Sequence, residues 1–97
     1  MENHSIIYNK VIERTKLGDE MKTLTNELVE IKKRRLEQWP LFRADAGSDK
    51  QADNMWEATP DGIRAMELKY LIDALKNRRS DLKLEIDVLR DEARNQY

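Results

Sequence analysis

Four carboxylates recur at every fourth position in the middle of the chain: Asp45, Asp49, Asp53 and Glu57. In a helix this spacing places all four on one face, where they could attract Mg²⁺ or Ca²⁺. The segment lacks the ligand spacing and the turn glycine of an EF-hand loop. His4 is the only histidine, so one chain cannot form a histidine cluster for a metal. We therefore expect a solvated acidic face, with no metal and no other cofactor.

Two basic clusters are the second candidate for chemistry. They occupy residues 32–35 and 76–83, and a basic stripe on a helix can follow a phosphate backbone. Acidic residues interleave with both clusters, and the net charge of −1 gives no global field that would attract nucleic acid. Nucleic-acid binding is thus the alternative function and not the favoured one. Its candidate contacts are Lys32, Lys33, Arg34, Arg35, Lys76, Arg78, Arg79 and Lys83.

The sequence contains no recognisable catalytic motif. It has no glycine-rich phosphate loop and no plausible pair of nucleophile and base, so we expect no enzyme. No apolar run approaches the roughly 20 residues that span a bilayer, and we expect no membrane association. The chain also has no cysteine, which fits a reducing compartment, and we expect a cytoplasmic protein.

An apolar seam organises the last third of the chain. Its members alternate spacings of three and four over four heptads, with Arg79 in the one gap: Ala65, Leu68, Ile72, Leu75, Leu82, Ile86, Leu89 and Ala93. A shorter seam lies upstream and continues to Leu36 and Trp39: Leu17, Met21, Leu24, Leu28 and Ile31. Such seams predict two long helices that pack lengthwise, as in a coiled coil.

The boundaries of these helices are marked by proline and by capping residues. Pro40 is expected to end the first helix, because its ring removes a donor and disfavours helical geometry at Trp39. Ser48 and Gln51 have the spacing of a capping box, and Pro60 is well placed to open the last helix. The sequence predicts one all-α domain over residues 1–97, a long antiparallel helical hairpin. Its parts are a helix over 3–39, a connection over 40–59 with a possible short helix over 48–57, and a helix over 60–94.

Two helices alone bury a thin core, and the apolar face at residues 6–12 is wider than a two-helix seam requires. We expect this face to be covered by a second copy, forming a four-helix bundle, or by a larger protein. Arg14, Arg35 and Arg79 fall at seam positions. They either extend their charged groups into water or form register-setting pairs with carboxylates.

Both tryptophans and the only phenylalanine of the chain lie at the bend of the hairpin, within residues 39–56. These aromatic side chains either close the hairpin tip as a small core or form a contact surface, since aromatic anchors dominate binding hot spots. The favoured function is a non-enzymatic protein–protein interaction module, such as an adaptor, a small inhibitor or an assembly subunit. Its predicted contact residues are Leu24, Leu28, Ile31, Trp39, Phe42, Trp56, Leu75, Leu82 and Leu89.

Overall fold

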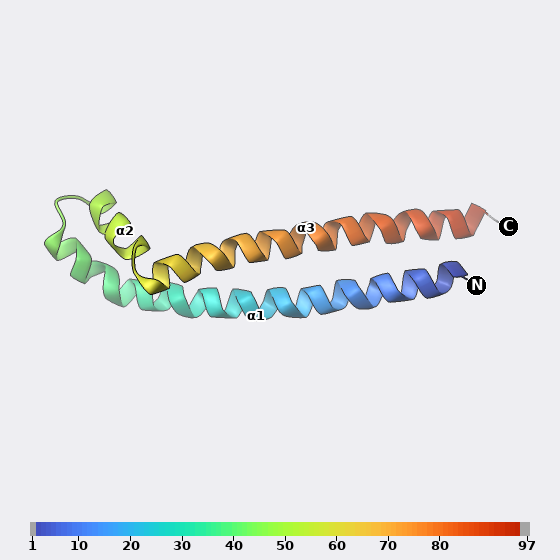
Figure 1. Ribbon diagram of the computed structural model, residues 1–97, viewed down its shortest axis with the longest axis horizontal. Helices are drawn as coiled ribbons and strands as arrows, with labels where there is room; N and C mark the ends of the chain where they lie inside the picture. The colour runs from blue at the N-terminus through green and yellow to red at the C-terminus, as the bar shows by residue number, and fades with distance from the viewer. Residues whose placement is uncertain (1, 96–97) are drawn as a thin grey trace. The chain divides into compact units, whose positions relative to one another are not determined.

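The computed structural model describes residues 2–95. Three α-helices account for nearly all of them: α1 (Glu2–Asp45), α2 (Asp49–Glu57) and α3 (Pro60–Asn95) (Figure 1). No strand occurs in this part of the chain, and the predicted all-α fold is confirmed. The ends of the predicted domain, residue 1 and residues 96–97, lie outside the described residues.

The contacts of the chain divide it into two compact units. Unit 1 consists of residues 1–22 and 73–97, and unit 2 of residues 23–72. Helices α1 and α3 each contribute one segment to unit 1 and another to unit 2, whereas α2 belongs to unit 2 alone. That the whole chain folds as a single domain stays a prediction.

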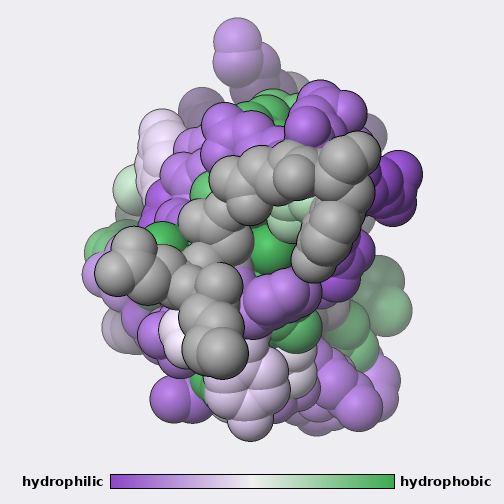
Figure 2. All heavy atoms as spheres, turned by 90° about the vertical axis from the view of Figure 1, so that its right-hand side faces the viewer, coloured by the Kyte–Doolittle hydropathy of each residue, from purple (hydrophilic) through white to green (hydrophobic). Residues whose placement is uncertain are grey.

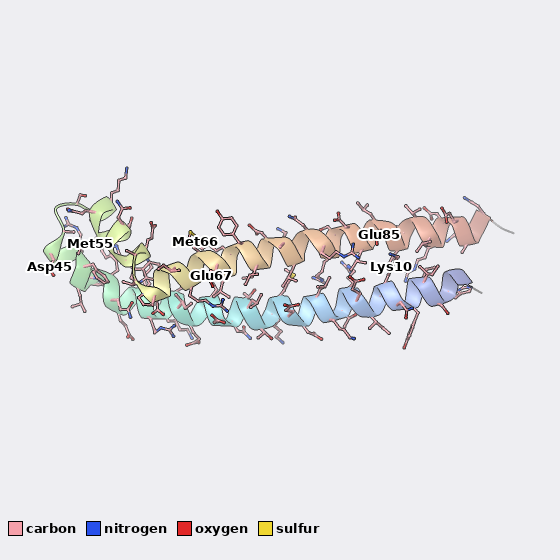
Figure 3. All side chains as sticks on the ribbon, viewed as in Figure 1. Lys10, Asp45, Met55, Met66, Glu67 and Glu85 are labelled. Atoms are coloured by element: carbon pink, nitrogen blue, oxygen red, sulfur yellow. The ribbon has the colours of Figure 1, made fainter. Side chains whose placement is uncertain are left out.

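Within each unit the segments of α1 and α3 run antiparallel. In unit 1, Lys10 pairs with Glu85, whereas Glu13, further along α1, pairs with Arg78, which comes earlier in α3. The side chains of Lys10 and Glu85 point toward one another in Figure 3. The ion pairs that join α1 to α3 in unit 2 follow the same reversed order. The predicted antiparallel pairing is therefore present in both units.

The sequence predicted that helix α1 ends before Pro40, and this is wrong. The helix continues past Pro40 for another five residues, to Asp45. Pro40 withholds its N–H from one carbonyl only, that of Leu36, and both residues are exposed, so water can donate in its place. Beyond Pro40 the helix is held by Phe42, which packs against the core of unit 2. This packing outweighs one missing hydrogen bond near the end of a helix.

The predicted short helix is present as α2, and its cap resembles the expected capping box. The Ser48 hydroxyl accepts a hydrogen bond from the Gln51 N–H at 3.2 Å. The Gln51 side chain accepts one from the N–H of Gly47 at 2.6 Å, one residue earlier than in the standard box. Helix α3 begins at Pro60, as predicted, and the Thr59 hydroxyl caps its first turn.

The two units have different interiors. Unit 2 has a buried apolar cluster formed by all three helices, comprising Leu28, Ile31, Trp56, Ala65 and Leu68. Among the described residues of unit 1, only Leu82 and Ile86 are buried. Figure 2 views the end of the molecule at which α1 begins, where hydrophilic side chains cover most of the visible face with hydrophobic patches between them. No helix within residues 2–95 is both long enough and apolar enough to cross a bilayer.

Candidate protein-interaction site

The predicted contact residues lie mainly in the interiors of their own units. In unit 2, Leu28, Ile31 and Trp56 are buried, and Leu24, Trp39 and Phe42 pack against them. In unit 1, Leu82 is buried, and Leu75 and Leu89 are half-buried. These side chains pack helix on helix within one chain, and their role toward a partner stays a prediction.

The aromatic side chains at the end of unit 2 are fixed by polar partners on α1 and α2. The Trp56 indole N–H donates to Gln38 Oε1 at 3.2 Å, and the Arg35 guanidinium lies 5.1 Å above the Trp56 ring. Asp53 Oδ1 accepts from the Trp39 indole at 2.7 Å and from Arg35 at 2.8 Å. This network makes the aromatic group part of the core that joins α2 to α1.

A groove in unit 2 exposes apolar surface next to this core. It has a volume of about 760 Å³ and is lined by residues of all three helices: Leu28, Val29, Lys32, Lys33, Arg35, Leu36, Trp56, Glu57, Gly62, Ala65, Met66 and Lys69. Leu36 is 76% exposed, Met66 55% and Val29 43%. Met66 points outward from α3 in Figure 3. Exposed apolar side chains gathered in one groove are typical of a protein-binding surface.

The charges around the groove are mostly positive. Four of its lining side chains are basic and one, Glu57, is acidic. Lys33 pairs with Glu30, whereas Lys32 and Lys69 have no ion-pair partner among residues 2–95. The groove therefore combines an apolar floor with basic groups free to pair with an acidic partner.

The sequence analysis placed Leu36 in the apolar seam, and the structure shows that this was wrong. Counting from Ile31, the seam position is Arg35, so Leu36 is rotated about 100° away from it and faces the groove. Leu36 follows Val29 by seven residues, outside the seam register. That second apolar repeat is the signal that could have located the groove.

The predicted nucleic-acid contacts do not form one free basic surface. Arg34 forms a two-pronged pair with Asp61 at 2.9 and 3.0 Å, and Arg35 and Arg78 also bind carboxylates. Within residues 2–95, Lys32, Lys76 and Lys83 have no ion-pair partner. Each paired guanidinium would lose its carboxylate on binding phosphate, so the pairing weakens this function.

The ion pairs between α1 and α3 in unit 2 shift the pKa values of their carboxyl groups. The hydrogen bond from the Arg34 guanidinium lowers the pKa of Asp61. The hydrogen bond from Arg64 lowers the pKa of Glu27 in the same way, and the two carboxylates around Arg64 raise its pKa. These pairs hold the two walls of the groove in register and remain ionised at neutral pH.

The acidic row predicted as a solvated face has structural roles at two of its positions. Asp49 accepts a hydrogen bond from Arg43 at 2.6 Å, and Asp53 accepts from Arg35 and Trp39. Both residues thus tie α2 to α1, a function that the spacing of the row did not reveal. Across residues 2–95 no three His, Cys, Asp or Glu side chains are grouped so as to hold a metal ion.

Comparisons with known proteins leave the groove as the main guide to function. No family model, curated protein or solved structure matches the chain.

Proposed function

We propose that the protein is a non-enzymatic interaction module, an assembly subunit whose unit 2 groove receives an amphipathic helix from a second copy of the chain. The observation that carries the proposal is the groove itself, where Val29, Leu36 and Met66 expose apolar surface beside the unpaired Lys32 and Lys69. A helix with an apolar stripe and acidic flanks is complementary to it in shape and in charge. A cytoplasmic location is part of this proposal and is supported by the absence of cysteine.

The chain carries such a stripe on the part of α3 in unit 1. Leu84 and Val88, one helical turn apart, are 66% and 55% exposed. Asp81, Asp87 and Asp91 surround them and are also exposed. At about 100° per residue, Asp81 and Asp87 fall on opposite sides of Leu84. The stripe of one copy therefore offers what the groove of another copy lacks, an apolar ridge between carboxylates.

Charge-reversed variants provide the test, because each variant removes one half of the contact. The first variant combines Lys32→Glu with Lys69→Glu in the groove, and the second combines Asp81→Lys with Asp87→Lys beside the stripe. We expect the native chain to form dimers at micromolar concentration in sedimentation equilibrium and each variant to be monomeric. A mixture of the two should associate again, because the native stripe of the first variant meets the native groove of the second.

Substitutions of two exposed leucines by glutamate give a matched control for this experiment. Leu36→Glu places a charge in the groove and should abolish association. Leu41→Glu introduces the same charge at a residue that is 71% exposed and lies outside the groove, and it should have no effect. A native chain that is monomeric at micromolar concentration, or dimers that withstand both Leu36→Glu and the charge reversals, would contradict the proposal.

Nucleic-acid binding stays the alternative function, favoured by the unpaired Lys32, Lys76 and Lys83. It predicts that the chain binds single-stranded RNA with an affinity that falls steeply as salt rises. Lys76→Glu combined with Lys83→Glu would abolish that binding and leave dimers intact. Fluorescence anisotropy of a labelled oligonucleotide measures this directly.

A further inference from the structure

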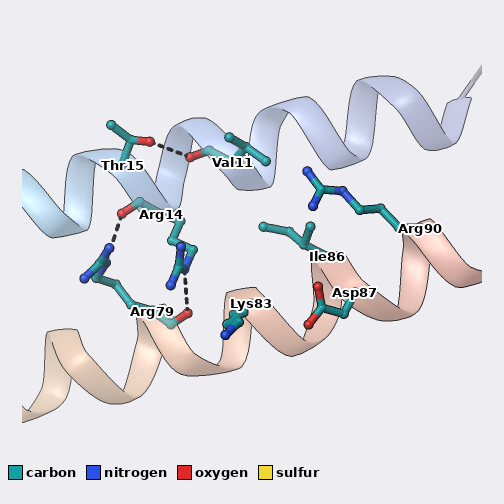
Figure 4. Close-up of a pocket in the computed structure, with 8 residues that line it drawn as sticks. All are labelled: Val11, Arg14, Thr15, Arg79, Lys83, Ile86, Asp87 and Arg90. Atoms are coloured by element: carbon teal, nitrogen blue, oxygen red, sulfur yellow. Dashed lines mark hydrogen bonds between the residues drawn. The ribbon is translucent and has the colours of Figure 1, made fainter.

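Two arginine side chains cross between the helices in the middle of unit 1. Arg14 Nε donates to the carbonyl oxygen of Arg79, and Arg79 Nε donates to that of Arg14, both at 3.3 Å (Figure 4). Both residues are half-buried. Gly18 lies beside the crossing, where a Cβ would lie 3.3 Å from the Arg79 guanidinium. The sequence analysis left open whether these arginines extend into water or pair with carboxylates, and the structure shows no such pair for either of them within residues 2–95.

The arginine pair has no acidic counterpart in the described part of the chain. Within residues 2–95 neither Arg14 nor Arg79 forms an ion pair. Glu13 and Glu85, which join the two helices in this unit, are bound to Arg78 and Lys10. A guanidinium carries five N–H donors, and each of these two uses only one. Two partly buried guanidinium groups, each hydrogen-bonded to the backbone of the other residue, thus retain N–H donors that have no partner within residues 2–95.

A hollow of about 250 Å³ opens beside the pair, and three further charged side chains line it. Lys83 and Arg90 add positive charge, and Asp87 is the single carboxylate (Figure 4). The remaining lining is formed by Val11, Thr15 and Ile86. Four cations around one carboxylate leave an excess of positive charge in a concave site with partly apolar walls, where charge interactions are stronger than in bulk water.

We propose that this hollow binds the phosphate or diphosphate group of a small ligand. A tetrahedral oxyanion can accept several hydrogen bonds at once from guanidinium groups, and Lys83 supplies a further point charge. The hollow is open to solvent but small, and its size fits one or two phosphates better than a nucleic-acid backbone, which needs a continuous track of contacts. This proposal does not depend on the groove of unit 2, and it shares with the proposed stripe of unit 1 the single residue Asp87.

Isothermal titration of the full chain with inorganic pyrophosphate, at constant ionic strength in chloride, tests the site. We expect saturable binding of one pyrophosphate per chain, and weaker binding of inorganic phosphate at the same site. Arg79→Gln should lower the affinity for pyrophosphate by about tenfold or more, because it removes a charged donor pair. Lys83→Gln, at an exposed position that the fold does not need, should lower it severalfold.

Lys16→Gln is the matched control, because it removes the same charge from an exposed residue that does not line the hollow. Its affinity should stay within about twofold of the native value, since exposed charges at a distance are screened. Helicity measured by circular dichroism identifies any variant that fails to fold, and Lys83→Gln then decides the result. Sedimentation of Arg79→Gln should still show dimers, so that failure of this site and failure of the proposed function can be told apart.

Three outcomes would overturn the proposal. The first is that pyrophosphate gives no saturable binding to the native chain. The second is an equal loss of affinity in Lys16→Gln and Lys83→Gln, which would make the effect one of general charge. The third is an oligonucleotide that binds through Arg79 and Lys83 while pyrophosphate fails to compete, which would assign these residues to nucleic acid.

Discussion

The two units share one helical pairing but differ in what closes it. In unit 2 a third helix covers the pair, and side chains from all three helices form a buried cluster that includes Leu68, with no exposed area. Unit 1 has two helical segments only, and two seam arginines cross between them, whereas the seam arginine of unit 2, Arg35, pairs with Asp53 of α2. The comparison shows that two helices alone bury single seam side chains such as Leu82, whereas the third helix of unit 2 allows several buried side chains to form one cluster.

The first prediction removes the side chain on which the interior of unit 2 depends most. Trp56 contacts the apolar cluster, donates to Gln38 and lies beneath Arg35. Trp56→Ala should lower the free energy of unfolding by about 3–5 kcal/mol, because it leaves a large cavity. Urea denaturation followed by circular dichroism measures this loss.

Leu41→Ala is the control for this measurement, since Leu41 is an exposed residue of the same unit. It should change the free energy of unfolding by less than about 0.5 kcal/mol. If Trp56→Ala were equally mild, the aromatic side chains would act as a contact surface and not as a core, and the contrast between the units would disappear.

The architecture of unit 2 could be predicted from the sequence in part. Heptad spacing located the helix pair, and Ser48 and Pro60 located the starts of α2 and α3, because these signals act within a few residues. The end of α1 could not be predicted in this way. Whether a helix continues past Pro40 depends on Phe42 finding a core to pack against, and that core is formed by residues far away in the sequence.

The candidate site was less predictable than the fold. The seam residues found by periodicity form the interior, whereas the groove depends on Leu36, which the sequence analysis placed in the seam, and on Met66, which it left out. Asp53 shows the same limit. Its spacing suggested a solvated face, and only the folded chain brings its carboxylate to the Trp39 indole. Local patterns report which residues a helix presents, but not which neighbour receives them.

The second prediction tests how tightly unit 2 is closed. A Cβ at Gly62 would collide with the carbonyl oxygen of Trp56 and would lie 2.6 Å from the Cα of Glu57. Backbone atoms cannot move aside as a side chain can, so Gly62→Ala should cost about 1–3 kcal/mol of stability. Alanine favours a helix over glycine by about 1 kcal/mol, and the collision has to exceed that gain. Urea denaturation measures the net change in the free energy of unfolding.

The third prediction makes the same substitution in unit 1 and expects the opposite sign. A Cβ at Gly18 would meet only the end of the Arg79 side chain, which can shift. Gly18→Ala should therefore stabilise the protein, by at most the roughly 1 kcal/mol that alanine gains in a helix. Urea denaturation beside Gly62→Ala gives the direct comparison. If both substitutions destabilise alike, the arginine crossing is as rigid as the core of unit 2.

The last and smallest effect concerns the ion pairs of the two units. Ion pairs lower the pKa of Asp61 and Glu27 in unit 2 and of Glu85, which binds Lys10, in unit 1. A carboxyl group with a lowered pKa in the folded state stabilises that state when ionised. This contribution is complete at neutral pH. It declines as the pH falls below the ordinary values of 4.5 for Glu and 3.8 for Asp, toward the lower folded values.

Thermal unfolding between pH 7 and pH 3 measures this decline. Arg34→Gln removes the partner of Asp61, so its melting temperature should fall less with acid than that of the native chain. Lys22→Gln, at an exposed residue with no ion pair within residues 2–95, should leave the acid dependence unchanged. The difference should shrink in 1 M salt, because these pairs are partly exposed and screened. An acid dependence that Arg34→Gln does not alter would mean that the packing of the apolar core alone sets the register of unit 2. The ion pairs would then contribute nothing to that register.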